Sequence, residues 1–221
     1  MSAHAALPLA ILISGRGSNM VAIAQACAAG RIDARVNHVI CDRADAPGIA
    51  RARELGLTTS LIERAAFADA GAFEAALLDA LALHAHALVA LAGFMRILSR
   101  EFVARYAGKM LNIHPSLLPH YRGLNTHHRV LEARDTHHGA SVHFVTAELD
   151  SGPVVLQSRI PLLPGYTEQT LAQRVQASEH IIYPKVIGWI AQQRLVWRDN
   201  RPWFDGEPLE TPIVEEFRAP P

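Results

Sequence analysis

The stretch from Met110 to Pro119, M-L-N-I-H-P-S-L-L-P, holds the residue types best suited to chemistry. Met110 to Ile113 predicts a short buried strand that must end at Pro115, because proline lacks a backbone donor. Side chains two apart on a strand point to the same face, so Asn112 and His114 should emerge side by side at its carboxyl edge. An amide donor next to an imidazole can hold a developing oxyanion and move a proton. A strand end with a turn-capping Asn and a half-buried His explains this stretch alone equally well.

A glycine-rich turn near the N-terminus indicates an anion site. Leu7 to Ser14 is an almost unbroken apolar run, typical of a strand covered on both faces. Gly15-Arg16-Gly17-Ser18-Asn19 follows it, and Met20 to Ala29 predicts a helix. This layout aims backbone N–H groups at an anion. The turn lacks the third glycine of a dinucleotide fingerprint and the lysine of a P-loop, which favours the phosphate of a small ligand. A tight turn without a ligand is the alternative.

Strands and helices alternate along the first half of the chain. Apolar runs predict further strands at Arg35 to Cys41, Thr58 to Ile62 and Ala87 to Ala92. Helices are expected between and after them, at Ile49 to Leu55, Gly71 to His84 and Ser99 to Tyr106. This alternation with short loops predicts an α/β fold with a doubly wound, mostly parallel sheet.

Ligands bind such sheets beyond the carboxyl ends of the strands. Three loops should therefore converge there: Gly15 to Asn19, Gly93 to Leu98, and Asn112 to Pro119. Their convergence strengthens the functional interpretation of each loop.

The pattern changes after Pro119. Thr126 should cap a helix that runs to about Arg134. Two alternating segments predict half-exposed strands that pair antiparallel, and a long helix and a hairpin follow; these are Ala140 to Thr146, Val154 to Ile160, Thr167 to Gln192 and Leu195 to Phe204. Thr167 is the expected N-cap of the long helix, and Pro184 should kink or split it.

We expect one domain over residues 1–207, because no repeat and no linker interrupts the chain. Its N-terminal lobe should reach to about residue 106 and its C-terminal lobe from 107 to 207. The proline-rich stretch from Gly206 to Pro221 predicts a poorly ordered tail, with residues 208–221 flexible.

The composition is that of a soluble globular protein, with 50% apolar and 19% charged residues among 221. Lys+Arg and Asp+Glu both number 21, so no basic excess argues for nucleic acid or a membrane surface. Cys27 and Cys41 form no C-x-x-C motif, and no signal peptide or long apolar run is present. We therefore expect a cytoplasmic protein, monomeric or a weak homodimer.

The twelve histidines do not form a metal motif. There is no H-E-x-x-H, and the rings of the adjacent pairs His127-His128 and His137-His138 should diverge on a regular backbone. No metal is expected. His143 shares a strand face with Ser141, and it faces either the cleft or, more commonly for a strand histidine, solvent.

Asp150 lies in the turn Asp-Ser-Gly-Pro. Its carboxylate either bonds a nearby backbone N–H or lies near His114 across the strand ends. In the second position it would favour the imidazolium and help to move a proton through water. No nucleophile elbow is present, which favours a mechanism without a covalent enzyme intermediate.

Four ordered motifs give a specific resemblance. They are I-S-G-R-G-S-N (Ile13 to Asn19), L-A-G-F-M-R-I-L (Leu91 to Leu98), N-I-H-P-S-L-L-P (Asn112 to Pro119) and G-A-S-V-H-F-V-T-x-E-L-D-S-G-P (Gly139 to Pro153). With these, the chain from about Ala10 to Trp203 resembles the folate-dependent formyltransferases that act on glycinamide ribonucleotide. The resemblance implies a Rossmann-like formyltransferase fold. It also implies formyl transfer from 10-formyltetrahydrofolate, as co-substrate, to the amino group of glycinamide ribonucleotide in purine synthesis.

The same resemblance implies roles for individual residues. The substrate would be held by Gly17, Ser18 and Asn19 at its phosphate and ribose, and also by Gln176 and Glu179. The folate would be held by Met95, Arg96, Ile97, Leu98, Asn112, Thr146, Ala147, Glu148, Leu149 and Asp150. Asn112, His114 and Asp150 match the catalytic trio of the family.

Two departures and two rival functions stay open. Many relatives have a basic residue shortly after the phenylalanine that matches Phe67, where this chain has Ala68, Asp69 and Ala70. Arg122 and Asn125 also alter the loop from 120 to 126. A formyltetrahydrofolate hydrolase would usually carry an added N-terminal domain, and about six residues before the first strand leave no room for it. A non-catalytic folate- or nucleotide-binding module would have no use for a proton shuttle.

Overall fold

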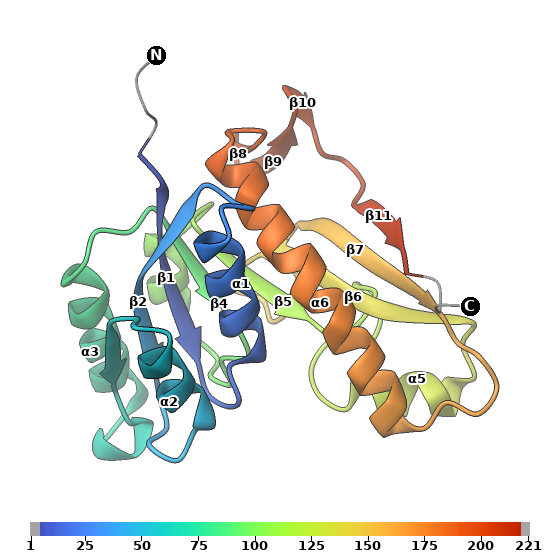
Figure 1. Ribbon diagram of the computed structural model, residues 1–221, viewed down its shortest axis with the longest axis horizontal. Coiled ribbons are helices and arrows are strands. Elements are labelled where there is room, and N and C mark those ends of the chain that lie inside the picture. The colour runs from blue at the N-terminus through green and yellow to red at the C-terminus, as the bar shows by residue number, and fades with distance from the viewer. Residues whose placement is uncertain (1–4, 218–221) are drawn as a thin grey trace.

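The computed structural model describes residues 5–217, which build a central eight-stranded sheet and a separate three-stranded one (Figure 1). The central order is β11-β7-β6-β5-β4-β1-β2-β3. These strands are β1 Leu7–Ile13, β2 Ala34–Cys41, β3 Thr59–Leu61, β4 Leu88–Leu91, β5 Met110–His114, β6 His137–Phe144, β7 Val154–Pro161 and β11 Ile213–Glu216. The small sheet contains β8 Leu195–Arg198, β9 Arg201–Phe204 and β10 Glu207–Pro208.

The predicted fold class is confirmed by the strand directions. The strands β3, β2, β1, β4 and β5 run parallel to one another. Strand β6 is antiparallel to both β5 and β7, and β11 is parallel to β7. The carboxyl ends of β1, β4 and β5 therefore lie at one edge of the sheet, as the sequence predicts for a doubly wound fold.

Helices cover both faces of the sheet. They are α1 Ser18–Ala28, α2 Pro47–Glu54, α3 Ala70–Ala82, α4 Arg100–Arg105, α5 Thr126–Ala133 and α6 Glu168–Ala191, with a short 3-10 helix at Arg64–Ala66. Strand β1 contacts the helices on both faces of the sheet. Leu9, Ile11 and Ile13 pack with α1, α2 and α6, whereas Ala10 and Leu12 pack with α3 and α4 on the other side. Both faces of β1 are buried, which explains its unbroken apolar sequence.

Helix α6 crosses one face of the sheet as a single element of 24 residues (Figure 1). Thr167 is its N-cap and accepts a hydrogen bond from the Thr170 N–H, as predicted. The prediction that Pro184 splits the helix is wrong. Neighbouring packing holds the helix together across the proline: Tyr183 is fully buried, and its hydroxyl lies 3.1 Å from the carbonyl oxygens of Leu91 and Leu111.

The segment from 120 to 144 differs from the prediction at both of its elements. Asn125, not Thr126, occupies the N-cap position of α5, and it adopts a left-handed conformation without a side-chain cap. Strand β6 begins at His137, three residues earlier than expected, and is buried on both faces from His138 onward. The polar alternation of β6 therefore marks a buried polar network and not a solvent-exposed face.

The C-terminal stretch also differs from the predicted tail. The hairpin β8–β9 is confirmed. Beyond it, β10 extends the small sheet, and β11 adds a parallel strand to the edge of the central sheet beside β7. Ion pairs of Glu216 with Arg159 and of Glu215 with Lys185 fix β11 in place. Residues 218–221 of the predicted tail lie outside the described residues.

Candidate active site

Asn112 and His114 lie on one face at the carboxyl end of β5, as period two predicts. Strand β6 runs antiparallel beside them, with Asn112 opposite His143 and His114 opposite Ser141. Asn112 is half-buried, whereas His114 is buried. The amide and the imidazole are therefore neighbours.

Asp150 reaches His114 from the loop between β6 and β7. Its Oδ2 lies 3.4 Å from His114 Nδ1, and each of the two side chains is only 7% exposed. The same oxygen accepts a hydrogen bond from the Gly123 N–H at 3.0 Å. Both interpretations of Asp150 are thus met at once, since it bonds a backbone N–H and also faces the imidazole.

The second nitrogen of His114 has a partner as well. His114 Nε2 lies 2.9 Å from the carbonyl oxygen of Tyr121 and must donate to it, because a carbonyl only accepts. Both ring nitrogens therefore face acceptors, one neutral and one a carboxylate. The negative charge of Asp150 therefore lies directly against the ring of His114, on the side of Nδ1.

His143 is a site residue whose position the sequence leaves open. It is buried, so the solvent-facing alternative is wrong. Its Nδ1 donates to the Phe144 carbonyl at 2.9 Å. Burial lowers the pKa of His143, outweighing the opposing effects of that hydrogen bond and of Asp150. A neutral ring with Nδ1 protonated leaves Nε2 to accept from Asn112 Nδ2 at 3.1 Å. His143 therefore orients the amide of Asn112 through one of its two N–H groups, and the second N–H of Asn112 does not take part in this contact.

The glycine-rich turn lies at the carboxyl end of β1 and leads straight into α1. Gly17 has a φ of +67° and is the N-cap, so α1 begins at Ser18, two residues earlier than predicted. A Cβ on Gly17 would lie 3.0 Å from the Cα of Gly48. Ser18 and Asn19 thus form the first turn of the helix, where free N–H groups are available to an anion.

Helix α6 brings two predicted substrate residues to this turn. Gln176 Nε2 donates to Ser18 Oγ at 3.0 Å, and Asn19 Nδ2 donates to Glu179 Oε2 at 2.8 Å. Burial raises the pKa of the Glu179 carboxyl, against a smaller lowering by the Asn19 hydrogen bond. The structure therefore places all four of these side chains together, although more than 150 residues separate the partners in each pair.

Polar contacts with Ser14 and Asp42 fix the loop after β4, residues 93–98. The Met95 N–H donates to Ser14 Oγ at 2.8 Å, and Arg96 pairs with the buried carboxylate of Asp42. Met95 and Ile97 are 66% and 79% exposed, whereas Leu98 is buried. The loop therefore presents two large apolar side chains to solvent on a fixed backbone.

The loop from Thr146 to Asp150 lies after β6. Thr146 is half-buried, its Oγ1 donates to the Glu148 carbonyl at 3.4 Å, and Ala147, Glu148 and Leu149 are exposed. Asp150, with a φ of +49°, turns back into the site. The exposed part of this loop is available to a ligand, while its last residue is fixed beside His114.

Two histidines outside this site, one on α5 and one on β6, contact each other. His127 Nδ1 lies 3.0 Å from His138 Nε2. The pair His127-His128 therefore contacts the pair His137-His138 through one ring of each. Burial lowers the pKa of His138 to about 3, which keeps it neutral. Within residues 5–217, no three His, Cys, Asp or Glu side chains are placed to hold a metal ion. No helix of this part of the chain is both long and apolar enough to span a membrane.

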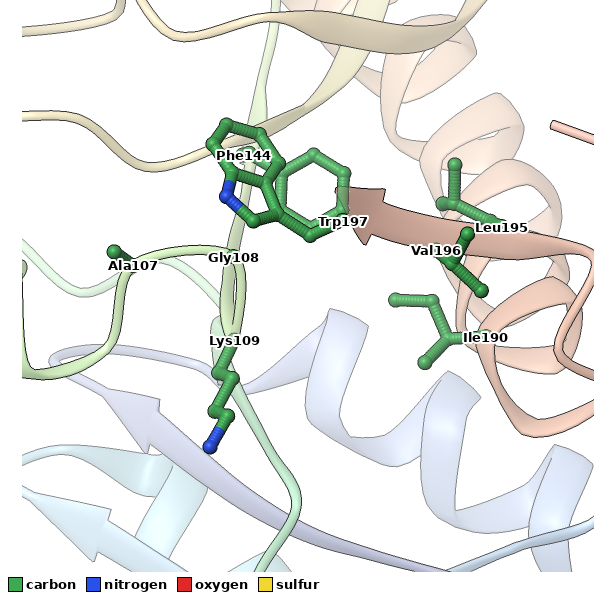
Figure 2. Close-up of a pocket in the computed structure, with 8 residues that line it drawn as sticks. All are labelled: Ala107, Gly108, Lys109, Phe144, Ile190, Leu195, Val196 and Trp197. Carbon is green, nitrogen blue, oxygen red and sulfur yellow. The ribbon is translucent and has the colours of Figure 1, made fainter. Parts of the chain in front are cut away.

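A cavity of about 260 Å³ lies at the opposite end of β5 (Figure 2). Gly108 and Lys109, which line it, directly precede that strand. Trp197 packs against Phe144 with ring centroids 4.8 Å apart, and a Cβ on Gly108 would lie 2.3 Å from the indole. This cavity belongs to the packing of the small sheet against the central one, and not to the site around His114.

Comparison with known proteins places this sequence in a family. The family model described as formyl transferase matches residues 7–187. The phosphoribosylglycinamide formyltransferase of Escherichia coli (strain K12) is 49% identical over 201 residues, which cover 91% of this chain and 95% of that protein. The enzyme of the same name from Haemophilus influenzae is 43% identical, with the same coverage.

Solved structures give the same result. The phosphoribosylglycinamide formyltransferase of Coxiella burnetii has a TM-score of 0.90 and 45% identity, covering 94% of this chain and 98% of that one. A formyltetrahydrofolate deformylase from Pseudomonas putida has a TM-score of 0.83 at 21% identity, which shows a shared fold alone. The matches in sequence and in structure agree with the site geometry: this chain belongs to the formyl transferase family.

Proposed function

We propose that this protein transfers a formyl group from 10-formyltetrahydrofolate to the amino group of glycinamide ribonucleotide, a step of purine biosynthesis. The proposal is supported mainly by the 3.4 Å distance between Asp150 Oδ2 and His114 Nδ1, and by His143, which contacts both Asn112 and Asp150. A glycine-rich turn follows β1 at the same edge of the sheet. The enzymes from E. coli and H. influenzae carry the name of this activity and align over nearly their whole length.

The substrate phosphate and ribose are assigned to the turn of Gly17, Ser18 and Asn19. The amide groups of the first helical turn and the positive end of the α1 dipole favour an anion there. Gln176 and Glu179 approach the same turn from α6 and offer an amide and a carboxyl group to the glycinamide part. A carboxyl group on this side also suits the approach of an amine.

The folate is assigned to the two loops that flank the end of β5. Met95, Arg96, Ile97 and Leu98 form one wall, and the exposed side chains of Met95 and Ile97 supply an apolar surface for a pterin ring. The loop from Thr146 through Ala147, Glu148 and Leu149 to Asp150 forms the other wall. This chain has Ala68, Asp69 and Ala70 where many relatives have a basic residue, so we expect these two walls and Asn112 to provide most of the affinity.

The reaction we propose is direct attack of the substrate amine on the formyl carbon, which produces a tetrahedral oxyanion. The free N–H of Asn112, oriented by neutral His143, donates to that oxyanion. His114 has both nitrogens engaged, so it stabilises the oxyanion by its charge and not by a direct hydrogen bond. Asp150 faces the imidazolium of His114, and its Oδ1, which lies 3.8 Å from His143 Nε2, takes the amine proton through a water molecule. The tetrahedral intermediate then collapses: the bond between the formyl carbon and N10 of the folate breaks, and N10 receives the proton through water. Formylated ribonucleotide and tetrahydrofolate are the products. Preorganised donors and charges of this kind are worth about 3 kcal/mol each.

The test is incubation of the protein with 10-formyltetrahydrofolate, with and without glycinamide ribonucleotide. We expect deformylated folate, with formylated ribonucleotide in equal amount, only when both substrates are present. Deformylation without the amine would mean hydrolysis instead, the activity named for the P. putida structure of the same fold. Saturable binding without any product would mean a non-catalytic module.

A further inference from the structure

The loop from Tyr121 to Asn125 supplies two of the contacts that hold the proposed catalytic pair. The carbonyl of Tyr121 accepts from His114 Nε2 at 2.9 Å, and the N–H of Gly123 donates to Asp150 Oδ2 at 3.0 Å. One contact fixes a proton on the imidazole and the other fixes the carboxylate. Both come from backbone atoms, so they depend on the conformation of the loop and not on the type of its side chains.

That conformation is intrinsically unfavourable. Tyr121, Gly123 and Asn125 have φ values of +55°, +77° and +57°. Only glycine adopts the left-handed region freely, and the other residue types persist there when surrounding contacts hold them. The loop must therefore be held by groups outside it.

Two side chains provide that support. Arg129 of α5 donates from Nη1 to the carbonyl of Arg122 at 2.7 Å and reaches that of Leu124 at 3.4 Å. Its guanidinium carbon lies 5.3 Å from the centre of the Tyr121 ring, in cation–π geometry. Asp135 Oδ2 accepts from the hydroxyl of Tyr121 at 2.5 Å. Both the backbone and the ring of the loop are thus tied to the segment that follows it.

We propose that Arg129 is a positioning residue for formyl transfer. It holds the strained loop so that the Tyr121 carbonyl and the Gly123 N–H meet His114 and Asp150, while the guanidinium itself touches neither of them. Tyr121 acts with it through its hydroxyl bond to Asp135. The inference rests on the proposed function for its kinetic part, and its structural part, the bond between His114 and the loop, can be measured without any substrate.

The test compares three variants with the wild type. Arg129→Ala removes the support, Tyr121→Phe removes only the hydroxyl, and Glu132→Ala is the matched control. Glu132 is an exposed residue of the same helix, and its carboxylate lies 4.0 Å from His128 Nε2, away from the loop. Two measurements are made on each protein: kcat for formyl transfer, and the NMR resonance of the proton on His114 Nε2.

We expect Arg129→Ala to lower kcat between about tenfold and a hundredfold, because small misplacements of a reacting group have effects of this size. The His114 Nε2–H resonance, protected in the wild type by its bond to Tyr121, should exchange too fast to be seen. Tyr121→Phe should change both measurements in the same direction by less, and Glu132→Ala should change neither. If Arg129→Ala does not fold, Tyr121→Phe decides the test alone.

The proposal is overturned if the resonance persists in the variants, or if it disappears while kcat stays within about twofold of the wild type. It is also overturned if Glu132→Ala behaves like Arg129→Ala, because the effect would then be general to α5. Failure of the proposed function gives a different result, since the wild type itself would then show no transfer while the resonance could still respond to the variants.

Discussion

Replacing Asp150 with asparagine isolates the charge that faces His114. Asp150 Oδ2 lies 3.4 Å from His114 Nδ1, and opposite unit charges at that distance interact by about 5 kcal/mol at an effective dielectric constant of about 20. The asparagine amide oxygen still accepts from the Gly123 N–H, so the loop contact is retained. Residual solvent screening reduces the effect of removing this charge. We expect about 3 kcal/mol of transition-state stabilisation to disappear, at least about a hundredfold in kcat.

The assay is kcat for formyl transfer at saturating concentrations of both substrates, with thermal unfolding as the test of folding. Asp79→Asn, on the exposed surface of α3, is the matched control for removal of a carboxylate and should leave kcat unchanged. A properly folded Asp150→Asn protein with kcat within about tenfold of the wild type would refute the reasoning. The charge of Asp150 would then be unnecessary for stabilising the transition state.

Three further predictions concern stability. Burial lowers the pKa of His138 from 6.5 to about 3, so the unfolded chain binds a proton below pH 6.5 that the folded protein does not bind. The free energy of unfolding should therefore fall by about 2 kcal/mol between pH 6.5 and pH 5. Urea unfolding at these two pH values should show a smaller fall in His138→Gln, and an equal fall would contradict this. Gly108→Ala should lower the unfolding free energy by about 2 kcal/mol, since its Cβ would clash with Trp197, and an unchanged Tm would count against that packing. Burial raises the pKa of Glu179, so the wild type loses stability as pH rises through that pKa. Glu179→Gln should therefore raise Tm at neutral pH and weaken ribonucleotide binding, and a lowered Tm would show that the carboxylate is stabilising.

The parts of the site that follow from local periodicity could be predicted. Period two on a strand puts Asn112 and His114 on the same face whatever surrounds them, and the structure has them there. The convergence of three loops at one sheet edge follows from the parallel topology, which the alternation of strands and helices reveals. These predictions depend on short-range geometry that the sequence encodes directly.

The parts that depend on tertiary packing could not be predicted. The alternation in β6 indicates one exposed face, but His143 is buried there, against Asn112 of β5 and Asp150 of the loop that follows β6. The contacts of Tyr121 and Gly123 with His114 and Asp150 come from the backbone, which carries no sequence signal. A signal for His143 was present in its register opposite Asn112, but strand pairing had to be known first.

The C-terminus and α6 show the same limit. The stretch after Gly206 is rich in proline and polar residues, yet Ile213 to Glu216 pair with β7 because that strand has an unpaired edge. Pro184 should disrupt an isolated helix. In this protein α6 continues through it, because the buried hydroxyl of Tyr183 beside it holds the helix to the carbonyl groups of Leu91 and Leu111 in the sheet. Long-range partners decide both outcomes.

The central claim is that Asn112, His114 and Asp150 act together on one reacting atom. Single-turnover rates of formyl transfer in the three single alanine variants and in the triple variant test it most directly. Residues that act as a unit have strongly non-additive effects, so each single variant should lose at least about a hundredfold and the triple variant no more than about tenfold beyond the worst single one. Losses that multiply across the three positions would contradict the claim, because they would show three independent contributions. So would a single variant with a near-normal rate, which would remove that residue from the group.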